Sequence, residues 1–193
     1  MRKMPIGMQT FESIITGGFA YVDKTAWVYE LANEGQCFFL GRPRRFGKSL
    51  LLSTLEAYFE GKRELFEGLA MEKLEKEWAP HPVLHIDLNV ESYGNVDDLK
   101  SGLDTNLERY EKLWELEGQA ASKTPAARLH NLIQTASEKT GRKAVVLIDE
   151  YDRPLTQTMA QGKPNDDIRN ALKGFYGVLK SADRWLRFVL LTG

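Results

Sequence analysis

One stretch constrains the fold of this chain more than any other: Arg42-Pro43-Arg44-Arg45-Phe46-Gly47-Lys48-Ser49. It follows the short apolar run 37–40 and leads into an amphipathic segment that extends from Lys48 to Phe59. This order predicts a strand, a tight turn and a helix, with Gly-Lys-Ser at the turn. The arrangement is typical of a loop that binds phosphate, because backbone N–H groups and a helix N-terminus both favour anions.

Each residue type in this loop suits a nucleotide. We expect the nucleotide contacts to come from Arg42, Pro43, Arg44, Arg45, Phe46, Gly47, Lys48, Ser49 and Leu50. Gly47 lets the backbone approach closely, Lys48 would reach the β- and γ-phosphates, and the Ser49 hydroxyl would ligate Mg²⁺. The usual pattern has a glycine where Arg42 stands, and Pro43 removes one N–H. The alternative is a Gly-Lys-Ser turn without a ligand.

A second motif lies about a hundred residues further on. The apolar run 143–148 ends in Asp149 and Glu150. A continuous apolar run predicts a strand buried on both faces of a parallel sheet, and ligands bind at the carboxyl ends of such strands. Asp149 is expected to hold Mg²⁺ through water, and Glu150 to act as general base toward the attacking water. The alternative is a solvated strand end, but the two motifs together indicate an ATP site.

The bulk composition bounds the remaining possibilities. A chain of 193 residues, 42% of them hydrophobic, is long enough for one domain with a sizeable core. Its formal net charge of −1 gives no overall basic excess, so the composition does not indicate nucleic acid as a partner. It contains no apolar run of membrane-span length and no signal peptide, so we predict a cytoplasmic protein without a membrane partner. The single cysteine, Cys37, cannot form an internal disulfide and is expected in the core.

Helical and strand patterns alternate along the chain. They predict an α/β fold of the P-loop NTPase type, with a three-layer, doubly wound, mostly parallel sheet and helices on both faces. Residues 1–35 form an N-terminal extension and 36–193 the core. Helices are expected over 11–15, 25–32, 48–59, 95–117, 125–139 and 166–180, with one or two short ones in 63–78. Strands are expected over 37–40, 83–88, 143–149 and 187–192, a surface linker at 120–125 and a loop at 159–165.

A complete unit, residues 83–141, separates the loop strand from the carboxylate strand, so the two are not expected to be sheet neighbours. The layout resembles the P-loop division that has an inserted strand and a catalytic glutamate. In that division a polar residue ends the strand between the two and senses the γ-phosphate. Thr192 stands at that place, and the resemblance therefore implies a catalytic role for it beside Lys48 and Glu150.

Several strings resemble the bacterial AAA-ATPase-like family. They are Pro5-Ile6-Gly7, residues 21–25 (Tyr-Val-Asp-Lys-Thr), the 42–49 loop, residues 147–152 (Leu-Ile-Asp-Glu-Tyr-Asp) and Leu191-Thr192-Gly193. The resemblance covers essentially the whole chain and implies ATP and Mg²⁺ as cofactors. In this family the ATPase domain commonly precedes a PD-(D/E)XK nuclease-like domain, which it would regulate or drive. It also implies a further strand and a helical lid, so the chain resembles a truncated gene or fragment, and nucleic acid is a partner only through a missing C-terminal domain.

Other residues keep two interpretations. Arg42, Arg44 and Arg45 are candidates to contact phosphates, DNA or a neighbouring subunit of a homo-oligomer, or to form salt bridges with Asp149 or Asp152. Asp152 could also tune Mg²⁺ or orient Arg45. The 21–25 segment supplies either an adenine edge or helix caps. His85 is expected to be structural, and Asp87 is either structural or at the edge of the site.

Three functions follow from these features. The first is a domain that binds ATP or ADP and hydrolyses ATP with Mg²⁺. The second is a small-molecule kinase on the same fold, which would need an acceptor pocket. The third is a nucleotide-binding module without turnover.

Overall fold

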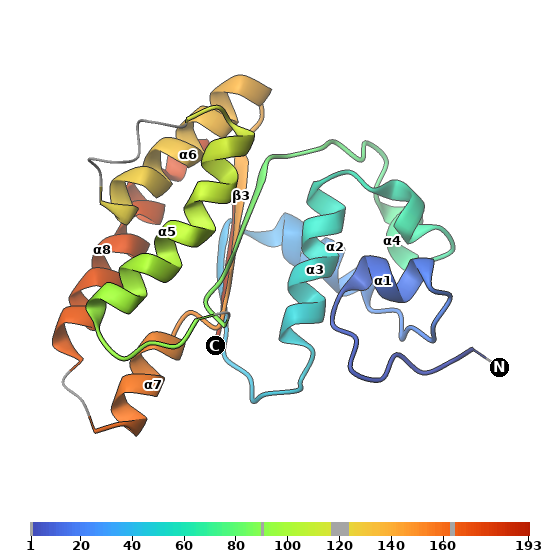
Figure 1. The fold of residues 1–193 in the computed structure, drawn as a ribbon. Helices are drawn as coiled ribbons and strands as arrows, with labels where there is room; N and C mark the ends of the chain where they lie inside the picture. The colour runs from blue at the N-terminus through green and yellow to red at the C-terminus, as the bar shows by residue number, and fades with distance from the viewer. Residues whose placement is uncertain (1, 90, 117–123, 163–164) are drawn as a thin grey trace.

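The computed structural model describes residues 2–89, 91–116, 124–162 and 165–193. Within these residues, four parallel strands form the central sheet in the order β1-β4-β3-β2 (Figure 1). The strands are β1 (Cys37–Leu40), β2 (Val83–Asp87), β3 (Ala144–Asp149) and β4 (Leu186–Thr192). The predicted order is confirmed, because the strand that ends in Thr192 separates the loop strand from the carboxylate strand.

Helices cover both faces of the sheet (Figure 1). One face packs against α5 (Val96–Leu113), α6 (Pro125–Thr140) and α8 (Asp166–Ser181). The other packs against α1 (Phe11–Thr16), α2 (Thr25–Glu34), α3 (Lys48–Phe59), α4 (Ala70–Leu74) and the 3₁₀ helix η1 (Arg63–Phe66). A second 3₁₀ helix, η3 (Asp183–Trp185), leads into β4. The α/β class and the two helical layers agree with the prediction from sequence.

The composition of β3 explains its central place. All six of its residues are buried. Val146 and Ile148 pack toward α5, α6 and α8, whereas Val145 and Leu147 pack toward α3. A strand covered on both faces needs apolar side chains in succession, which is the pattern that 144–148 shows.

Capping residues determine two of the helix ends that the sequence predicts. Asn95 accepts hydrogen bonds from the backbone N–H groups of Asp97 and Asp98, at 2.8 and 3.0 Å, and Asp98 accepts in return from the Asn95 N–H at 3.2 Å. This capping box satisfies the free donors at the start of α5. Gly141 ends α6 with φ of 66°, a left-handed conformation that glycine adopts without a Cβ penalty.

Three expectations about local structure need correction. Cys37 is exposed instead of buried, because β1 lies at the edge of the described sheet and both Cys37 and Phe39 face solvent. The segment after Glu150 forms a further helix, α7 (Arg153–Ala160), which includes the start of the loop expected at 159–165. Pro154 is compatible with its first turn, where a missing N–H costs nothing.

Helix α5 ends earlier than expected, at Leu113 instead of residue 117. Residue 117 itself and most of the predicted 120–125 linker lie outside the described residues. No helix in the described part of the chain is both long and apolar enough to span a bilayer.

The parallel strands place four chain segments at one edge of the sheet. Leu40 pairs with Thr192, and Asp87 pairs with Asp149, so the carboxyl ends of all four strands meet. This is the edge where ligands bind in open α/β sheets.

Candidate functional site

The 42–47 loop joins the end of β1 to the start of α3. The Arg42 N–H donates to the Gly193 carbonyl oxygen (3.0 Å), and the Gly193 N–H donates to the Leu40 carbonyl oxygen (3.2 Å). Arg45 and Gly47 both have positive φ, at 68° and 78°. The glycine adopts this conformation freely, whereas the arginine is strained, so the loop geometry is held by its surroundings.

Lys48 points back across this loop. Its side chain is only 6% exposed, and its Nζ donates to the Arg42 carbonyl oxygen at 2.8 Å. The same Nζ lies 3.2 Å from Glu150 Oε1. The ammonium group therefore has two oxygen partners, one from the loop and one from the end of β3.

Asp149 is the polar centre of the site. Ser49 Oγ donates to Asp149 Oδ2 at 2.7 Å, and Thr192 Oγ1 donates to Asp149 Oδ1 at 2.5 Å. The Glu150 N–H also donates to Oδ1, at 3.1 Å. The carboxylate is 5% exposed and has no cationic partner among the described residues. Three strand or helix ends thus converge on one buried carboxylate.

The turn after Asp149 is fixed on both sides. Glu150 has φ of 54°, which is unusual for a residue with a Cβ, and its carbonyl oxygen accepts from the Arg153 N–H at 3.0 Å. The Tyr151 N–H donates to the Thr192 carbonyl oxygen at 2.9 Å. A Cβ on Gly193 would lie 2.4 Å from the Tyr151 ring, so the close approach of these segments requires glycine there.

A hollow of about 830 Å³ opens over these residues. Its walls come from three parts of the chain: the N-terminal segment, the loop with the start of α3, and the ends of β2 and β3. The lining residues are Ile6, Gly7, Met8, Gln9, Arg44, Arg45, Gly47, Lys48, Ser49, Leu50, Asn89, Glu150 and Arg153.

The N-terminal wall is attached to α3, the helix that begins at Lys48. Ser53 Oγ accepts from the Phe11 N–H at 2.9 Å and donates to the Gln9 carbonyl oxygen at 3.2 Å. The Ala20 N–H donates to the Lys3 carbonyl oxygen at 2.8 Å. Residues 6–9 are therefore held beside the loop, although they are distant from it in sequence.

The structure gathers most of the residues expected at the site. Lys48, Ser49, Asp149, Glu150 and Thr192 meet at the strand ends, and Arg44, Arg45, Gly47 and Leu50 line the hollow. Arg42 contributes its carbonyl oxygen, whereas Pro43 and Phe46 lie outside the lining, with Phe46 62% exposed.

Sequence reasoning assigned no site role to Ile6–Gln9, Asn89 or Arg153. Asn89 and Arg153 follow strand ends, and that position in the sequence is a usable signal. The N-terminal segment is brought in only by tertiary packing.

Other expectations for charged residues are not met. Among the described residues Arg42, Arg44 and Arg45 form no ion pair, so of the interpretations kept open for them, the salt bridges to Asp149 or Asp152 are not found. The reason is that the Asp149 oxygens are already occupied by hydroxyl donors, while the arginines are exposed.

The 21–25 segment has a structural use. Asp23 accepts from the Thr25 N–H (2.9 Å), the Thr25 hydroxyl (2.7 Å) and the Ala70 N–H (2.8 Å). The Thr25 hydroxyl in turn accepts from the Met71 N–H at 3.0 Å. These bonds tie the start of α2 to α4, and none of residues 21–25 lines the hollow.

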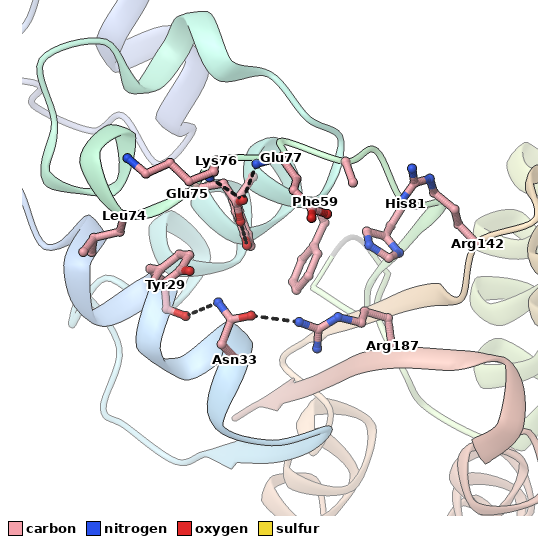
Figure 2. A pocket seen from close by; sticks show the side chains of 12 residues that line it. Tyr29, Asn33, Phe59, Leu74, Glu75, Lys76, Glu77, His81, Arg142 and Arg187 are labelled. Atoms are coloured by element: carbon pink, nitrogen blue, oxygen red, sulfur yellow. Dashed lines mark hydrogen bonds between the residues drawn. The ribbon is translucent and has the colours of Figure 1, made fainter.

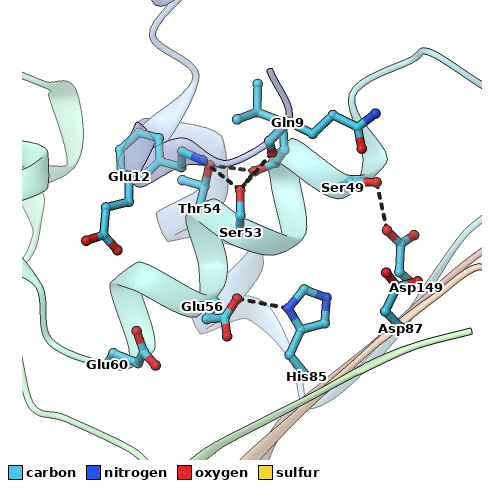
Figure 3. A network of polar contacts seen from close by, with 12 residues as sticks. Gln9, Glu12, Ser49, Ser53, Thr54, Glu56, Glu60, His85, Asp87 and Asp149 are labelled. Carbon is cyan, nitrogen blue, oxygen red and sulfur yellow. Dashed lines mark hydrogen bonds and ion pairs between the residues drawn. The ribbon is translucent and has the colours of Figure 1, made fainter. Parts of the chain in front are cut away.

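A polar network lies beneath the site (Figure 3). His85 Nδ1 and Glu56 Oε2 are 2.8 Å apart, linking β2 to α3, and His85 Nε2 is buried without a hydrogen-bond partner within the described residues. Asp87 accepts from the Asn89 N–H at 2.7 Å. The His85 contact joins β2 to α3, as its structural interpretation expects. Among the residues described, the Asp87 carboxylate bonds only to the chain two residues on, at the strand end that neighbours Asp149, whereas the Asp87 backbone N–H and carbonyl oxygen bond to Asn106 of α5.

A second, smaller hollow of about 380 Å³ lies at the amino ends of the strands (Figure 2). Arg187 there donates to Asn33 Oδ1 at 3.0 Å, and His81 Nδ1 donates to the Lys143 carbonyl oxygen at 2.8 Å. Burial lowers the pKa of His81, and the charges of Arg187 and Arg142 lower it further. This smaller hollow lies at the opposite end of the sheet from Asp149.

The fold and the site together define a parallel α/β domain with a lysine, a glutamate and a hydroxyl-bound aspartate at the carboxyl edge of its sheet. The chain belongs to the AAA-ATPase-like family, described as "Predicted AAA-ATPase", whose sequence model matches residues 5–193.

One curated relative comes from Azotobacter chroococcum mcd 1 and is described as "Uncharacterized protein in vnfD 5'region". It is 37% identical over 194 residues, and the alignment covers 100% of this chain but 37% of the relative. This chain therefore spans little more than a third of the relative's length. No solved structure matches the chain.

Proposed function

We propose that this chain is a P-loop domain of the type with an inserted strand, and that it binds Mg-ATP and hydrolyses it. The observation that carries the proposal is the convergence of the Ser49 and Thr192 hydroxyls on the buried Asp149 carboxylate, at 2.7 and 2.5 Å. Family membership supports the same class of ligand.

The residues at this edge fit a magnesium ion. No three His, Cys, Asp or Glu side chains of the described residues form a metal cage. Mg²⁺ does not need one, because it is commonly bound by one or two protein oxygens together with waters and substrate phosphates. Ser49 would supply a protein oxygen and Asp149 would hold the ion through a water, so their hydrogen bond would open to admit the ion. When bound, the ion would neutralise charge that develops on the phosphates.

The lining of the hollow favours one orientation of the nucleotide. The backbone N–H groups of the loop and the start of α3 would surround the phosphates, with Lys48 on the terminal ones. Residues Ile6–Gln9 line the same hollow and would form the wall against the base and ribose. A volume of about 830 Å³ lies within the size range of ligand sites, roughly 300–1,000 Å³.

Glu150 is the candidate base. Phosphate binding would draw Lys48 away from Glu150 Oε1 and leave the carboxylate free to accept a proton from water. The water oxygen would form a bond to the γ-phosphorus as the bond to the ADP oxygen breaks, and the proton would pass to Glu150. Thr192 would position Asp149 through its hydroxyl.

Calorimetric titration of the purified chain with Mg-ATP, together with an assay of phosphate release, tests this function. Wild-type chain should bind, and Lys48→Ala should lose binding by at least about tenfold, since charged hydrogen bonds are worth roughly 1.5–3 kcal/mol. No binding by a folded wild-type chain would contradict the proposal.

The second candidate is a binding module without turnover. The 3.2 Å pair between Lys48 and Glu150 favours it, because it occupies the base that hydrolysis needs. Binding without phosphate release above the level of Glu150→Gln would select this candidate. A small-molecule kinase would instead transfer phosphate to an added metabolite faster than to water.

A further inference from the structure

Arg153 occupies a distinctive position at the large hollow. It is the first residue of α7 and lines the hollow together with Glu150 and Asn89. Its N–H donates to the Glu150 carbonyl oxygen at 3.0 Å, and Pro154 follows it in the first turn of the helix. The backbone of Arg153 is therefore fixed relative to the candidate base.

Within the part of the chain that the structure describes, the guanidinium group of Arg153 has no hydrogen-bond or ion-pair partner. None of the ion pairs among the described residues includes it, and its Nε is buried without a hydrogen-bond acceptor in the described part of the chain. Arg128 and Arg187, by contrast, donate to Glu111 and Asn33. Because buried polar groups are nearly always paired, an unpaired arginine beside a hollow points to a ligand.

The two carboxylates at the end of β3 already have other partners. Glu150 pairs with Lys48, and Asp149 is occupied by the Ser49 and Thr192 hydroxyls. Burial raises the pKa of the nearby Tyr93 to about 12, and the charge of Arg153 acts against that increase. Tyr93 therefore stays neutral at physiological pH and does not neutralise the arginine.

We propose that Arg153 is a catalytic cation supplied in cis, which contacts the terminal phosphate of the bound nucleoside triphosphate. This inference rests on the proposed function. Glu150 marks the end of the hollow where the γ-phosphate would lie. Arg153 lines the same hollow and is held next to Glu150 by its backbone N–H, which donates to the Glu150 carbonyl oxygen at 3.0 Å. A guanidinium fork matches phosphate oxygens with two parallel hydrogen bonds and would stabilise the charge that spreads over them during transfer. The chain would then supply this arginine itself, without a contribution from a second subunit.

The affinities of Arg153→Gln for Mg-ATPγS and Mg-ADP test the proposal. Arg153→Gln should weaken Mg-ATPγS by at least about tenfold and Mg-ADP by less than about threefold, since only the triphosphate carries the contacted group. Phosphate release should fall by roughly 10³-fold or more, which is the low end of the effect of arginines that act on a transferring phosphate. Arg169→Gln is the matched control, because Arg169 is an exposed arginine of α8 paired with Asp166 at 2.8 Å.

Each outcome decides the matter. Equal losses for ATPγS and ADP, or no loss for either, would overturn the role of Arg153. Thermal melting without nucleotide checks that Arg153→Gln folds, and Arg153→Met, which keeps the aliphatic stem, replaces it if it does not. Failure of the proposed function is distinct, because the wild-type chain would then bind neither nucleotide. If Lys48→Ala abolishes nucleotide binding but Arg153→Gln does not change it, only the role of Arg153 is refuted and the proposed function stands.

Discussion

Lys48 Nζ and Glu150 Oε1 are 3.2 Å apart, so the residue proposed to bind the terminal phosphates and the residue proposed as the base pair with each other. Phosphate oxygens would compete with Glu150 for this ammonium. In the proposed function, nucleotide binding and release of the base would therefore be coupled through this one contact.

Glu150→Gln should separate these two effects. The amide removes the negative charge that competes for Lys48 and also removes the proton acceptor. We expect Mg-ATP affinity to rise by at least about twofold, because even a solvent-exposed ion pair is worth about 0.2–1 kcal/mol. Phosphate release should fall to background. Calorimetry and a phosphate assay on the same preparation check both, and retained turnover would eliminate Glu150 as the base.

Asp149→Asn should remove the dependence of nucleotide binding on magnesium. The amide lowers the charge at the proposed ion site, so the affinity for ATP in Mg²⁺ should fall by at least about tenfold and approach the value in EDTA. Asp87→Asn is the control, because Asp87 is the register neighbour of Asp149 but accepts from the Asn89 N–H. Equal losses in both variants would place the ion elsewhere or show a general effect of charge.

Arg128→Met should destabilise the fold strongly. Arg128 donates to both carboxylate oxygens of Glu111, at 2.8 and 2.7 Å, and also pairs with Asp104. Glu111 is 5% exposed, so the single change leaves a buried charge without a partner and should cost about 3–5 kcal/mol. Urea unfolding measures this cost. The double variant Arg128→Met/Glu111→Leu should recover most of it, and a double variant no more stable than the single one would contradict the explanation.

The Glu56–His85 contact should make stability depend on pH. Burial of Glu56 by itself would raise the pKa of its carboxyl group. The hydrogen bond and charge of His85, with the charges of Arg109 and Lys62, outweigh burial and hold that pKa below its usual 4.5. The unfolded state then binds the proton more readily than the folded state. The stabilisation is complete above about pH 4.5 and is lost as the pH falls through the lower, folded-state pKa.

Glu56→Gln isolates this contribution. The variant should be less stable than wild type near pH 7, and the difference should shrink as the pH falls below 4.5. Urea unfolding midpoints at several pH values provide the measurement. A constant difference across this range would show that ionisation of Glu56 does not contribute.

An element of this fold can be predicted from sequence when the residues that determine it are close together in the chain. The apolar run of β3 and the Asn95 and Gly141 caps are local signals, so these elements are predictable from a few residues. The exposure of Cys37 depends on the place of β1 in the sheet, which no local pattern encodes.

The same distinction applies to the site. Gly47-Lys48-Ser49 and Asp149-Glu150 are recognisable because the residues that define each motif are adjacent in the sequence. The wall formed by Ile6–Gln9 depends instead on contacts with Ser53, and the pairing of Lys48 with Glu150 joins residues about a hundred positions apart. Packing determines both, so they had to be seen in three dimensions.

The most direct test of the central claim is an experimental structure of the chain with Mg²⁺ and a non-hydrolysable ATP analogue. We predict phosphates against the backbone N–H groups of residues 44–49, Mg²⁺ between Ser49 and Asp149, and Lys48 on the phosphates instead of on Glu150. An analogue bound elsewhere, or bound here with the ion remote from Ser49 and Asp149, would contradict it.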